Sequence, residues 1–364
     1  MPFEAIGILH WNDYSETRPK PFDVVEPDFI ARCAQVHEEA GFDRLLIANS
    51  AHRPDSLPLA TWAAAATTRI KFMLAHRPGF IAPTMAARMF AMLDRMSAGP
   101  DGQGRAGVHI ITGGDDAEME ADGDFLTKDV RYRRSAEYVD VMRRVWQSDA
   151  PFDHEGEFYR ARGAFAHVRP GGGAVPIFWG GSSEWAIAQG AKVADVFAFP
   201  GFAPEVVQPL AADVLARAAT HGRRPDLLVS VKVLVGASKA DAWDRARGLL
   251  EELSAEVVDN GRAPTLPGES RAAAIARVLA QAEQDSFDGR MWTGISRVPT
   301  GRATIPCVIG SVDEVMDTLM AYHACGITRF ILSGYEPEAD ARMIGRLLIP
   351  RLREGVEGMA QQVF

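Results

Sequence analysis

The stretch IKFMLAHRPGFIAPTMAARMFAMLDRMSAG (70–99) decides how the chain is expected to fold. Its first six residues (70–75) form a mostly apolar run, which is typical of a strand covered on both faces. A turn follows, and residues 84–99 then place apolar side chains at helical spacing. The stretch therefore predicts one strand–loop–helix unit, and the same alternation recurs along the chain.

Eight such units are predicted in all. The expected strands are 6–10, 43–48, 70–75, 106–112, 175–180, 195–199, 227–236 and 328–334. The expected helices are 27–41, 59–68, 84–99, 131–147, 183–192, 204–222, 311–326 and 338–353. Eight repeats of strand and helix predict an α/β fold, a (β/α)8 TIM barrel with insertions.

A doubly wound open sheet is the alternative architecture. Such a sheet normally opens with a glycine-rich dinucleotide turn after its first strand. Here strand 6–10 runs into HWNDYSETRP, which contains no glycine. The barrel is therefore the preferred prediction.

A length of 364 residues permits two domains or one enlarged barrel. No stretch resembles an interdomain linker, so one domain over residues 1–364 is expected. Residues 148–170 predict a short hairpin, and residues 254–310 form a long insertion within the domain. Long insertions in a compact barrel are often mobile lids over a site, although a surface decoration or an oligomer contact is the alternative.

Composition excludes several classes of protein. The formal charge of −9, with no basic block, argues against nucleic acid as the main partner. No apolar run has the length of a membrane span, and the N-terminus lacks a basic signal-like start. The three cysteines (Cys33, Cys307 and Cys325) form no CxxC pair, so neither a disulfide framework nor a structural zinc site is expected. A cytoplasmic protein is the expectation.

Polar side chains gather where the predicted strands end, which is the active face of such a barrel. They include His10, Asn49, His76, His109, Thr112, Lys232 and Tyr335. A single histidine on a strand is more often structural than catalytic. Three histidines (10, 76 and 109) projected to one rim favour a binding site.

The sequence WGGSSEW (179–185) is the strongest local signal. Two glycines follow a strand and two serines open a helix, so backbone N–H groups, hydroxyls and the positive helix end form an anion cradle. An ordinary serine N-cap is the alternative. The position after a late barrel strand favours phosphate.

Metal and serine-hydrolase chemistry are not expected. The sequence has no HxH, HExxH or GxSxG motif. The acidic run GGDDAEMEADGD (113–124) lacks calcium-loop spacing and is better explained as a solvated loop and helix start.

The chain resembles the bacterial luciferase-like flavin monooxygenases, specifically their alkanesulfonate monooxygenase branch. Matching segments occur in the family's order over nearly the whole chain. They are EEAGFDRLLIA (38–48), the opening stretch extended to 67–99, HIITGGDDAEMEADGDFL (109–126), RYRRSAEYVDVMRRVW (131–146), EFYRARGAF (157–165), PIFWGGSS (176–183) and GITRFILSGY (326–335).

The resemblance implies a two-component monooxygenase. Reduced FMN, supplied by a separate NAD(P)H-dependent flavin reductase, would react with O2 to give a C4a-peroxyflavin that oxygenates a small organic substrate. Family members are commonly dimers or tetramers, so a homodimer or homotetramer is expected. An organic cofactor also agrees with the absence of metal-ligand motifs.

The resemblance also implies roles for individual residues. It places the FMN phosphate near Tyr132, Ser182 and Ser183, with Gly181 allowing close approach of the backbone. It places the isoalloxazine ring near Asn49, His76, His109 and Thr112, with His109 standing where the sulfonatases carry asparagine. Tyr335 faces the substrate, and the lid (287–305) offers Arg297 and Arg302. With His10 and Lys232, these three complete the candidate catalytic set.

The departures from the branch concern its sulfonate-binding residues. Ser230-Val231-Lys232 replaces an Arg-x-His pair, Pro200 stands near the place of a tryptophan, and Lys128-Asp129 lies where a histidine precedes the RY dipeptide. Lys232 keeps a cation for an anionic substrate or for proton transfer, or it is simply a lysine at the rim.

Several functions therefore stay open. Oxidation of an organosulfonate or related organosulfur compound is one. Hydroxylation, N-oxidation or Baeyer–Villiger oxidation is another. A non-catalytic flavin-binding protein and a deazaflavin-dependent reductase complete the set.

Overall fold

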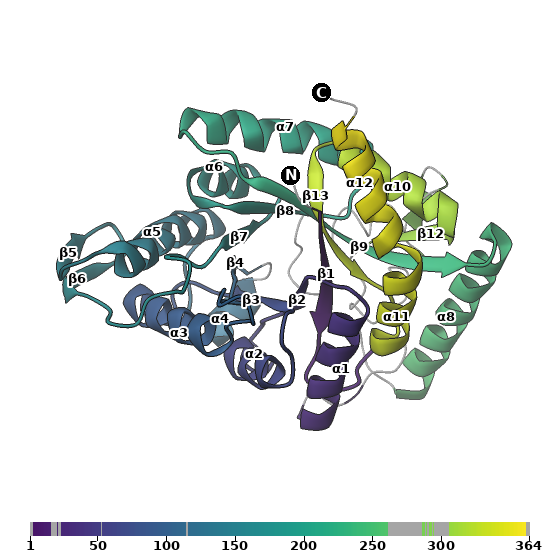
Figure 1. Cartoon of the computed structure of the whole chain (residues 1–364), viewed down its shortest axis with the longest axis horizontal. Helices are drawn as coiled ribbons and strands as arrows, with labels where there is room; N and C mark the ends of the chain where they lie inside the picture. The colour runs from purple at the N-terminus through teal and green to yellow at the C-terminus, as the bar shows by residue number, and fades with distance from the viewer. Residues whose placement is uncertain are drawn as a thin grey trace.

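Eight parallel strands form a closed barrel surrounded by helices (Figure 1). The computed structural model describes residues 3–15, 20, 23–51, 53–113, 116–260, 286–287, 289, 291–292, 294 and 306–361. The barrel strands are β1 (Glu4–Leu9), β2 (Arg44–Ile47), β3 (Lys71–His76), β4 (Val108–Ile110), β7 (Ile177–Gly180), β8 (Val196–Pro200), β9 (Asp226–Gly236) and β13 (Ile327–Ser333). The ring closes because β9 pairs with β8 on one side and with β13 on the other, and β13 pairs with β1. The predicted barrel and all eight predicted strands are confirmed.

Alternation along the strands separates the inside of the barrel from its outside. Apolar side chains from six strands meet in one buried interior cluster. They are Ile6, Met73, Phe178, Val196, Ala198, Leu228 and Ile331. Intervening residues such as Phe72, Leu74 and Val229 face outward and join the larger core under the helices. Both faces of each strand are therefore covered, which explains the mostly apolar strand sequences.

Helices follow the strands as predicted, with shifted ends. They are α1 (Pro27–Glu39), α2 (Ser56–Ala65), α3 (Pro83–Met96), α4 (Asp116–Ala121), α5 (Lys128–Gln147), α6 (Glu184–Val193), α7 (Pro204–Thr220), α8 (Lys239–Asn260), α10 (Val312–Ala324), α11 (Pro337–Leu347) and α12 (Ile349–Gln361). None of the helices in the described part of the chain is long and apolar enough to cross a membrane.

Two details of the helix prediction were wrong. The single helix expected over 338–353 is two helices, α11 and α12. Pro350, the second residue of α12, has no N–H to donate and its ring clashes with the preceding turn, so one continuous helix is broken there. The long helix α8 after β9 was not among the predicted ranges.

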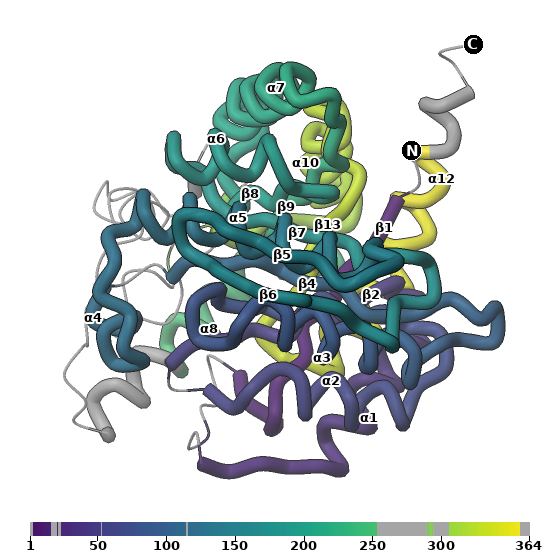
Figure 2. Tube along the Cα trace, turned by 90° about the vertical axis from the view of Figure 1, so that its left-hand side faces the viewer, coloured from purple at the N-terminus to yellow at the C-terminus, as the bar shows by residue number. Residues whose placement is uncertain are grey.

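The hairpin predicted over 148–170 is present as β5 (Phe152–Glu155) and β6 (Arg160–Ala164), which pair antiparallel. It lies outside the barrel along α5, and the side view shows it crossing the front of the molecule (Figure 2). The Glu137 carboxylate of α5 accepts hydrogen bonds from the backbone N–H groups of Phe158 and Tyr159, each at 2.9 Å, and so fixes the hairpin to the helix.

The insertion expected over 254–310 lies largely outside the described residues. Its described parts include β10 (Ser286–Phe287), β11 (Met291–Trp292) and β12 (Cys307–Ser311). Strand β9 continues beyond the barrel, and there its last five residues pair with β12. The barrel pairing of β9 gives way to pairing with β12 at Lys232, which pairs with Ser333 of β13 and with Cys307 of β12.

Candidate active site

The carboxyl ends of the barrel strands surround a cavity of about 330 Å³, within the range of small-ligand sites. Its lining comes from the ends of β2, β3, β4, β7 and β8 and from α4 and α5. The lining residues are Asn49, Arg77, Ile111, Thr112, Gly113, Glu118, Lys128, Tyr132, Gly180, Gly181, Ser182, Ser183 and Pro200. Six of the eight predicted cofactor residues belong to this set, namely Asn49, Thr112, Tyr132, Gly181, Ser182 and Ser183.

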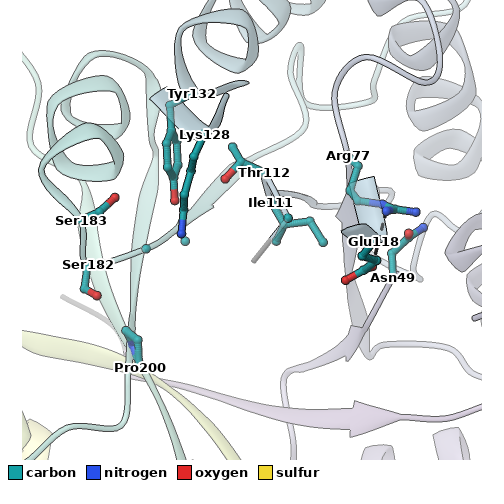
Figure 3. Close-up of a pocket in the computed structure, with 13 residues that line it drawn as sticks. Asn49, Arg77, Ile111, Thr112, Glu118, Lys128, Tyr132, Ser182, Ser183 and Pro200 are labelled. Carbon is teal, nitrogen blue, oxygen red and sulfur yellow. Dashed lines mark hydrogen bonds and ion pairs between the residues drawn. The ribbon is translucent and has the colours of Figure 1, made fainter. Parts of the chain in front are cut away.

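One end of the cavity contains the glycine turn and the two serines that were predicted to form an anion cradle (Figure 3). Ser183 is the N-cap of α6, and its hydroxyl accepts a hydrogen bond from the Ala186 N–H at 3.2 Å. Gly181 has a φ of +141°, and a Cβ there would lie 2.5 Å from the Ala186 Cβ and 2.9 Å from the Tyr132 hydroxyl. Only glycine fits this turn without displacing its neighbours.

Tyr132 extends from α5 into the same end of the cavity (Figure 3). Its hydroxyl hydrogen-bonds with the side chains of Thr112 and Ser183. Burial raises the pKa of Tyr132, so the phenol stays neutral and keeps its proton for donation at neutral pH. A tyrosine, two serines and a helix N-terminus together offer hydrogen-bond donors that can bind a phosphate group.

Lys128 also lines this end, one helical turn before Tyr132 on α5. Lys128 is a departure from the family pattern and was not among the predicted site residues. The signal that identifies it is its spacing of four residues from Tyr132, which places both side chains on one face of a helix.

The opposite end of the cavity carries Asn49 and Arg77 (Figure 3). Arg77 is buried and forms ion pairs with Glu118, at 3.5 Å, and with Asp122. Glu118 also accepts a hydrogen bond from the Ala51 N–H at 2.9 Å. These bonds connect α4 with the segments that follow β2 and β3.

His76 does not line the cavity. It has the outward orientation of Leu74 on β3, its Nε2 lies 2.7 Å from the Tyr138 hydroxyl, and its ring packs edge-on against Phe90 at 5.4 Å between centroids. Burial lowers the pKa of His76 to about 4, so the ring is neutral at physiological pH. These contacts give it a structural role under α3 and α5.

His109 faces inward on β4 but lies behind the cavity wall. A Cβ on the lining residue Gly180 would lie 3.1 Å from its Cε1 atom. Burial lowers the pKa of His109 to about 4, and its Nδ1 atom is buried without a hydrogen-bond partner. The atoms of His109 that face Gly180 are Cε1 and Nε2, so the imidazole backs this part of the cavity wall without lining the cavity.

The predicted catalytic residues that the structure describes lie on the other side of the barrel mouth. The Lys232 Nζ atom is 4.5 Å from the centre of the Tyr335 ring, and Tyr335 packs edge-on against Trp292 at 6.4 Å. His10 follows β1, the neighbour of β13. Burial, together with the charges of Arg53 and Lys232, lowers the pKa of His10 to about 3. The lid arginines Arg297 and Arg302 lie outside the described residues.

The donor set fits an organic phosphate-bearing cofactor. The Gly181 turn, the α6 N-terminus and the hydroxyls of Tyr132, Ser182 and Ser183 offer hydrogen-bond donors of the kind that bind a phosphate group. Among the residues that the structure describes, no group of three or more His, Cys, Asp or Glu side chains is arranged to hold a metal ion.

Comparisons with known proteins agree with this geometry. Residues 8–329 match the family model described as luciferase-like monooxygenase. Among solved structures, a riboflavin lyase crystallised with modified FMN and riboflavin matches with a TM-score of 0.77 and 19% identity, over 98% of this chain and 92% of that one. EDTA monooxygenase from Chelativorans sp. BNC1 matches with a TM-score of 0.75 and 16% identity, over 97% of this chain and 94% of that one. An F420-dependent secondary alcohol dehydrogenase bound to an F420–acetone adduct matches with a TM-score of 0.70 and 17% identity, over 97% of this chain and 99% of that one. At these identities the structural matches show a common fold.

Proposed function

This chain belongs to the luciferase-like monooxygenase family and is a flavin-dependent monooxygenase, and from that premise we propose that it uses reduced FMN and O2 to oxygenate a small organic substrate. A separate NAD(P)H-dependent flavin reductase supplies the reduced cofactor. The observation that carries the proposal is the anion cradle of Tyr132, Gly181, Ser182 and Ser183 at one end of a cavity that also includes Asn49 and Thr112.

The residues of the cavity hold the cofactor by its two ends. Ser182, Ser183 and Tyr132 bind the phosphate, and Gly181 lets the backbone approach it. Asn49 and Thr112 hydrogen-bond the ring system. When bound, reduced FMN supplies the two electrons with which O2 delivers one oxygen atom to the substrate and the other to water.

The substrate occupies the side of the barrel mouth formed by His10, Lys232 and Tyr335. Lys232 attracts a negative charge on the substrate or moves a proton, because a lysine amine serves both purposes. His10 is neutral at physiological pH, so it accepts or donates a hydrogen bond without adding charge.

The proposed reaction is oxidation at sulfur, including oxidative C–S cleavage of an organosulfonate. The second candidate is hydroxylation, N-oxidation or Baeyer–Villiger oxidation. Its support is the replacement of the sulfonatases' Arg-x-His pair by Ser230-Val231-Lys232 and of their tryptophan by Pro200.

Anaerobically reduced FMN, mixed with O2 and a panel of sulfonates, thioethers, amines and ketones, tests the proposal. We expect one substrate class to yield an oxygenated product coupled to FMNH2 oxidation. Sulfite release identifies C–S cleavage. FMN oxidation that no substrate alters contradicts an oxygenase and supports a flavin-binding protein. Tight binding of coenzyme F420 in place of FMN supports a deazaflavin-dependent reductase.

A further inference from the structure

Lys128 occupies a position that is unfavourable for a cation. It is the first residue of α5, directly after the N-cap Thr127, where the helix carries its positive end. Arg131, one turn later, adds a second positive charge. Burial and the Arg131 charge lower the pKa of Lys128, and only Asp116 opposes the shift. The local structure therefore gives no electrostatic reason for a lysine here, and such exceptions tend to mark functional sites.

The neighbouring carboxylates are occupied by other groups. Asp116 pairs with Arg131 at 2.8 Å, and Asp129 accepts the Thr127 hydroxyl at 2.6 Å. Within the described part of the chain, Lys128 has neither an ion pair nor a hydrogen bond. Figure 3 shows its side chain beside Tyr132, with both side chains extending into the end of the cavity that Ser182 and Ser183 also line.

The cavity has one other lining cation among the described residues, and it is already neutralised. Arg77, at the opposite end, is paired with Glu118 and Asp122. The cavity is thus electrostatically asymmetric, because its positive charge is balanced at the Arg77 end and unbalanced at the Lys128 end. A ligand with one anionic end is oriented by this difference.

We infer that Lys128 supplies the positive charge that binds a terminal phosphate monoester, so that this site selects flavin mononucleotide over riboflavin by charge. The inference rests on the proposed use of a flavin. The hydroxyls of Tyr132, Ser182 and Ser183 orient the phosphate, and the ammonium group of Lys128 balances its negative charge. Hydrogen bonds to charged groups are stronger than those between neutral groups, and this difference provides the selectivity.

Anaerobic titration of the protein with reduced FMN and with reduced riboflavin tests the inference. The wild-type protein should bind FMN at least tenfold more tightly than riboflavin. Lys128→Gln should weaken FMN binding by about 10- to 100-fold, as expected for loss of a charged hydrogen bond, and leave riboflavin binding within about twofold. Lys128→Arg should retain most of the preference. The matched control is Lys192→Gln in the last turn of α6, where the lysine bonds Gln189 at 3.0 Å, and it should change neither affinity.

Salt dependence gives a second measurement on the wild-type protein. Its FMN affinity should fall with ionic strength more steeply than its riboflavin affinity. Equal affinities for the two flavins, or equal losses of both in Lys128→Gln, would overturn the inference and leave flavin use intact. Binding of neither flavin to the wild-type protein would instead contradict the proposed function.

Discussion

The Nζ atom of Lys232 lies 4.5 Å from the centre of the Tyr335 ring. The two residues come from adjacent parts of the barrel mouth, Lys232 from the inner face of β9 and Tyr335 from the segment after β13. A cation over an aromatic face is attracted to it, by about 0.5–2 kcal/mol depending on solvation. The ring therefore restricts where the amine can lie at the entrance to the barrel.

Lys232→Ala should reduce turnover about 10- to 100-fold, because the amine faces the substrate side of the mouth. FMN affinity should change less than about threefold, since Lys232 does not line the flavin cavity. Steady-state kinetics and flavin titration measure the two effects. Tyr335→Phe keeps the ring below the amine and serves as the control for its position. Equal losses of turnover and flavin affinity in Lys232→Ala would contradict a substrate role.

Ser182→Ala combined with Ser183→Ala should weaken FMN binding about tenfold or more, because the two serine hydroxyls that bind the phosphate are lost. Loss of the Ser183 cap should also lower the free energy of unfolding by about 1 kcal/mol. Ser311→Ala removes the N-cap of α10, which has a capping box, and is the matched control. It should destabilise the protein comparably and leave FMN affinity unchanged. An unchanged affinity in the double variant would refute the phosphate assignment.

Gly181→Ala should both destabilise the protein and weaken FMN binding. The added Cβ would meet the Ala186 Cβ at 2.5 Å and the Tyr132 hydroxyl at 2.9 Å, and we expect a loss of about 1–3 kcal/mol. Gly173→Ala is the control, because Gly173 has a φ of +83° with open space around its Cβ position. It should cost about 1 kcal/mol of stability without affecting FMN. Chemical denaturation and flavin titration separate the two effects.

Stability should fall as the pH is lowered through the histidine range. Burial lowers the pKa of His10 to about 3 and those of His37, His76 and His109 to about 4. Between these values and about 6.5 the unfolded chain binds protons that the folded chain does not. The stabilisation is therefore complete above pH 6.5 and is lost progressively toward pH 4, by up to about 1.4 kcal/mol per pH unit for each histidine.

Urea unfolding at pH 7, 6 and 5 measures this slope. His76→Gln should make it shallower by up to about 1.4 kcal/mol per pH unit, since one buried titrating ring is removed. A slope identical in wild type and His76→Gln would show that His76 does not titrate differently on folding.

Arg77→Gln should weaken FMN and riboflavin binding by the same factor, about tenfold, because Arg77 lies at the end of the cavity away from the phosphate cradle. Removing it also leaves Glu118 and Asp122 without their shared cation. Parallel titrations with both flavins check the prediction. A loss confined to FMN would mean that the phosphate binds at the Arg77 end.

The order of strands and helices was predictable because burial on both faces leaves mostly apolar runs, and helices leave a 3.6-residue period. The turn at Gly181 and the Ser183 cap of α6 were also predictable, since a glycine turn and a serine cap are local features. Helix limits were less predictable. The split at Pro350 depends on one missing N–H, and the start of α5 at Lys128 lies one turn before its apolar pattern begins.

What the sequence by itself determined is thus the barrel, the family resemblance and the residues of one local turn. Only the tertiary structure decided which distant residues share a cavity. It separated His76, which faces the helices, from His10 and His109, which face inward, because a strand reverses the direction of its side chains at every residue. It also placed Lys128 in the same cavity as Ser182 and paired Arg77 with Glu118 of α4, since packing and long-range electrostatics depend on contacts that no local pattern encodes.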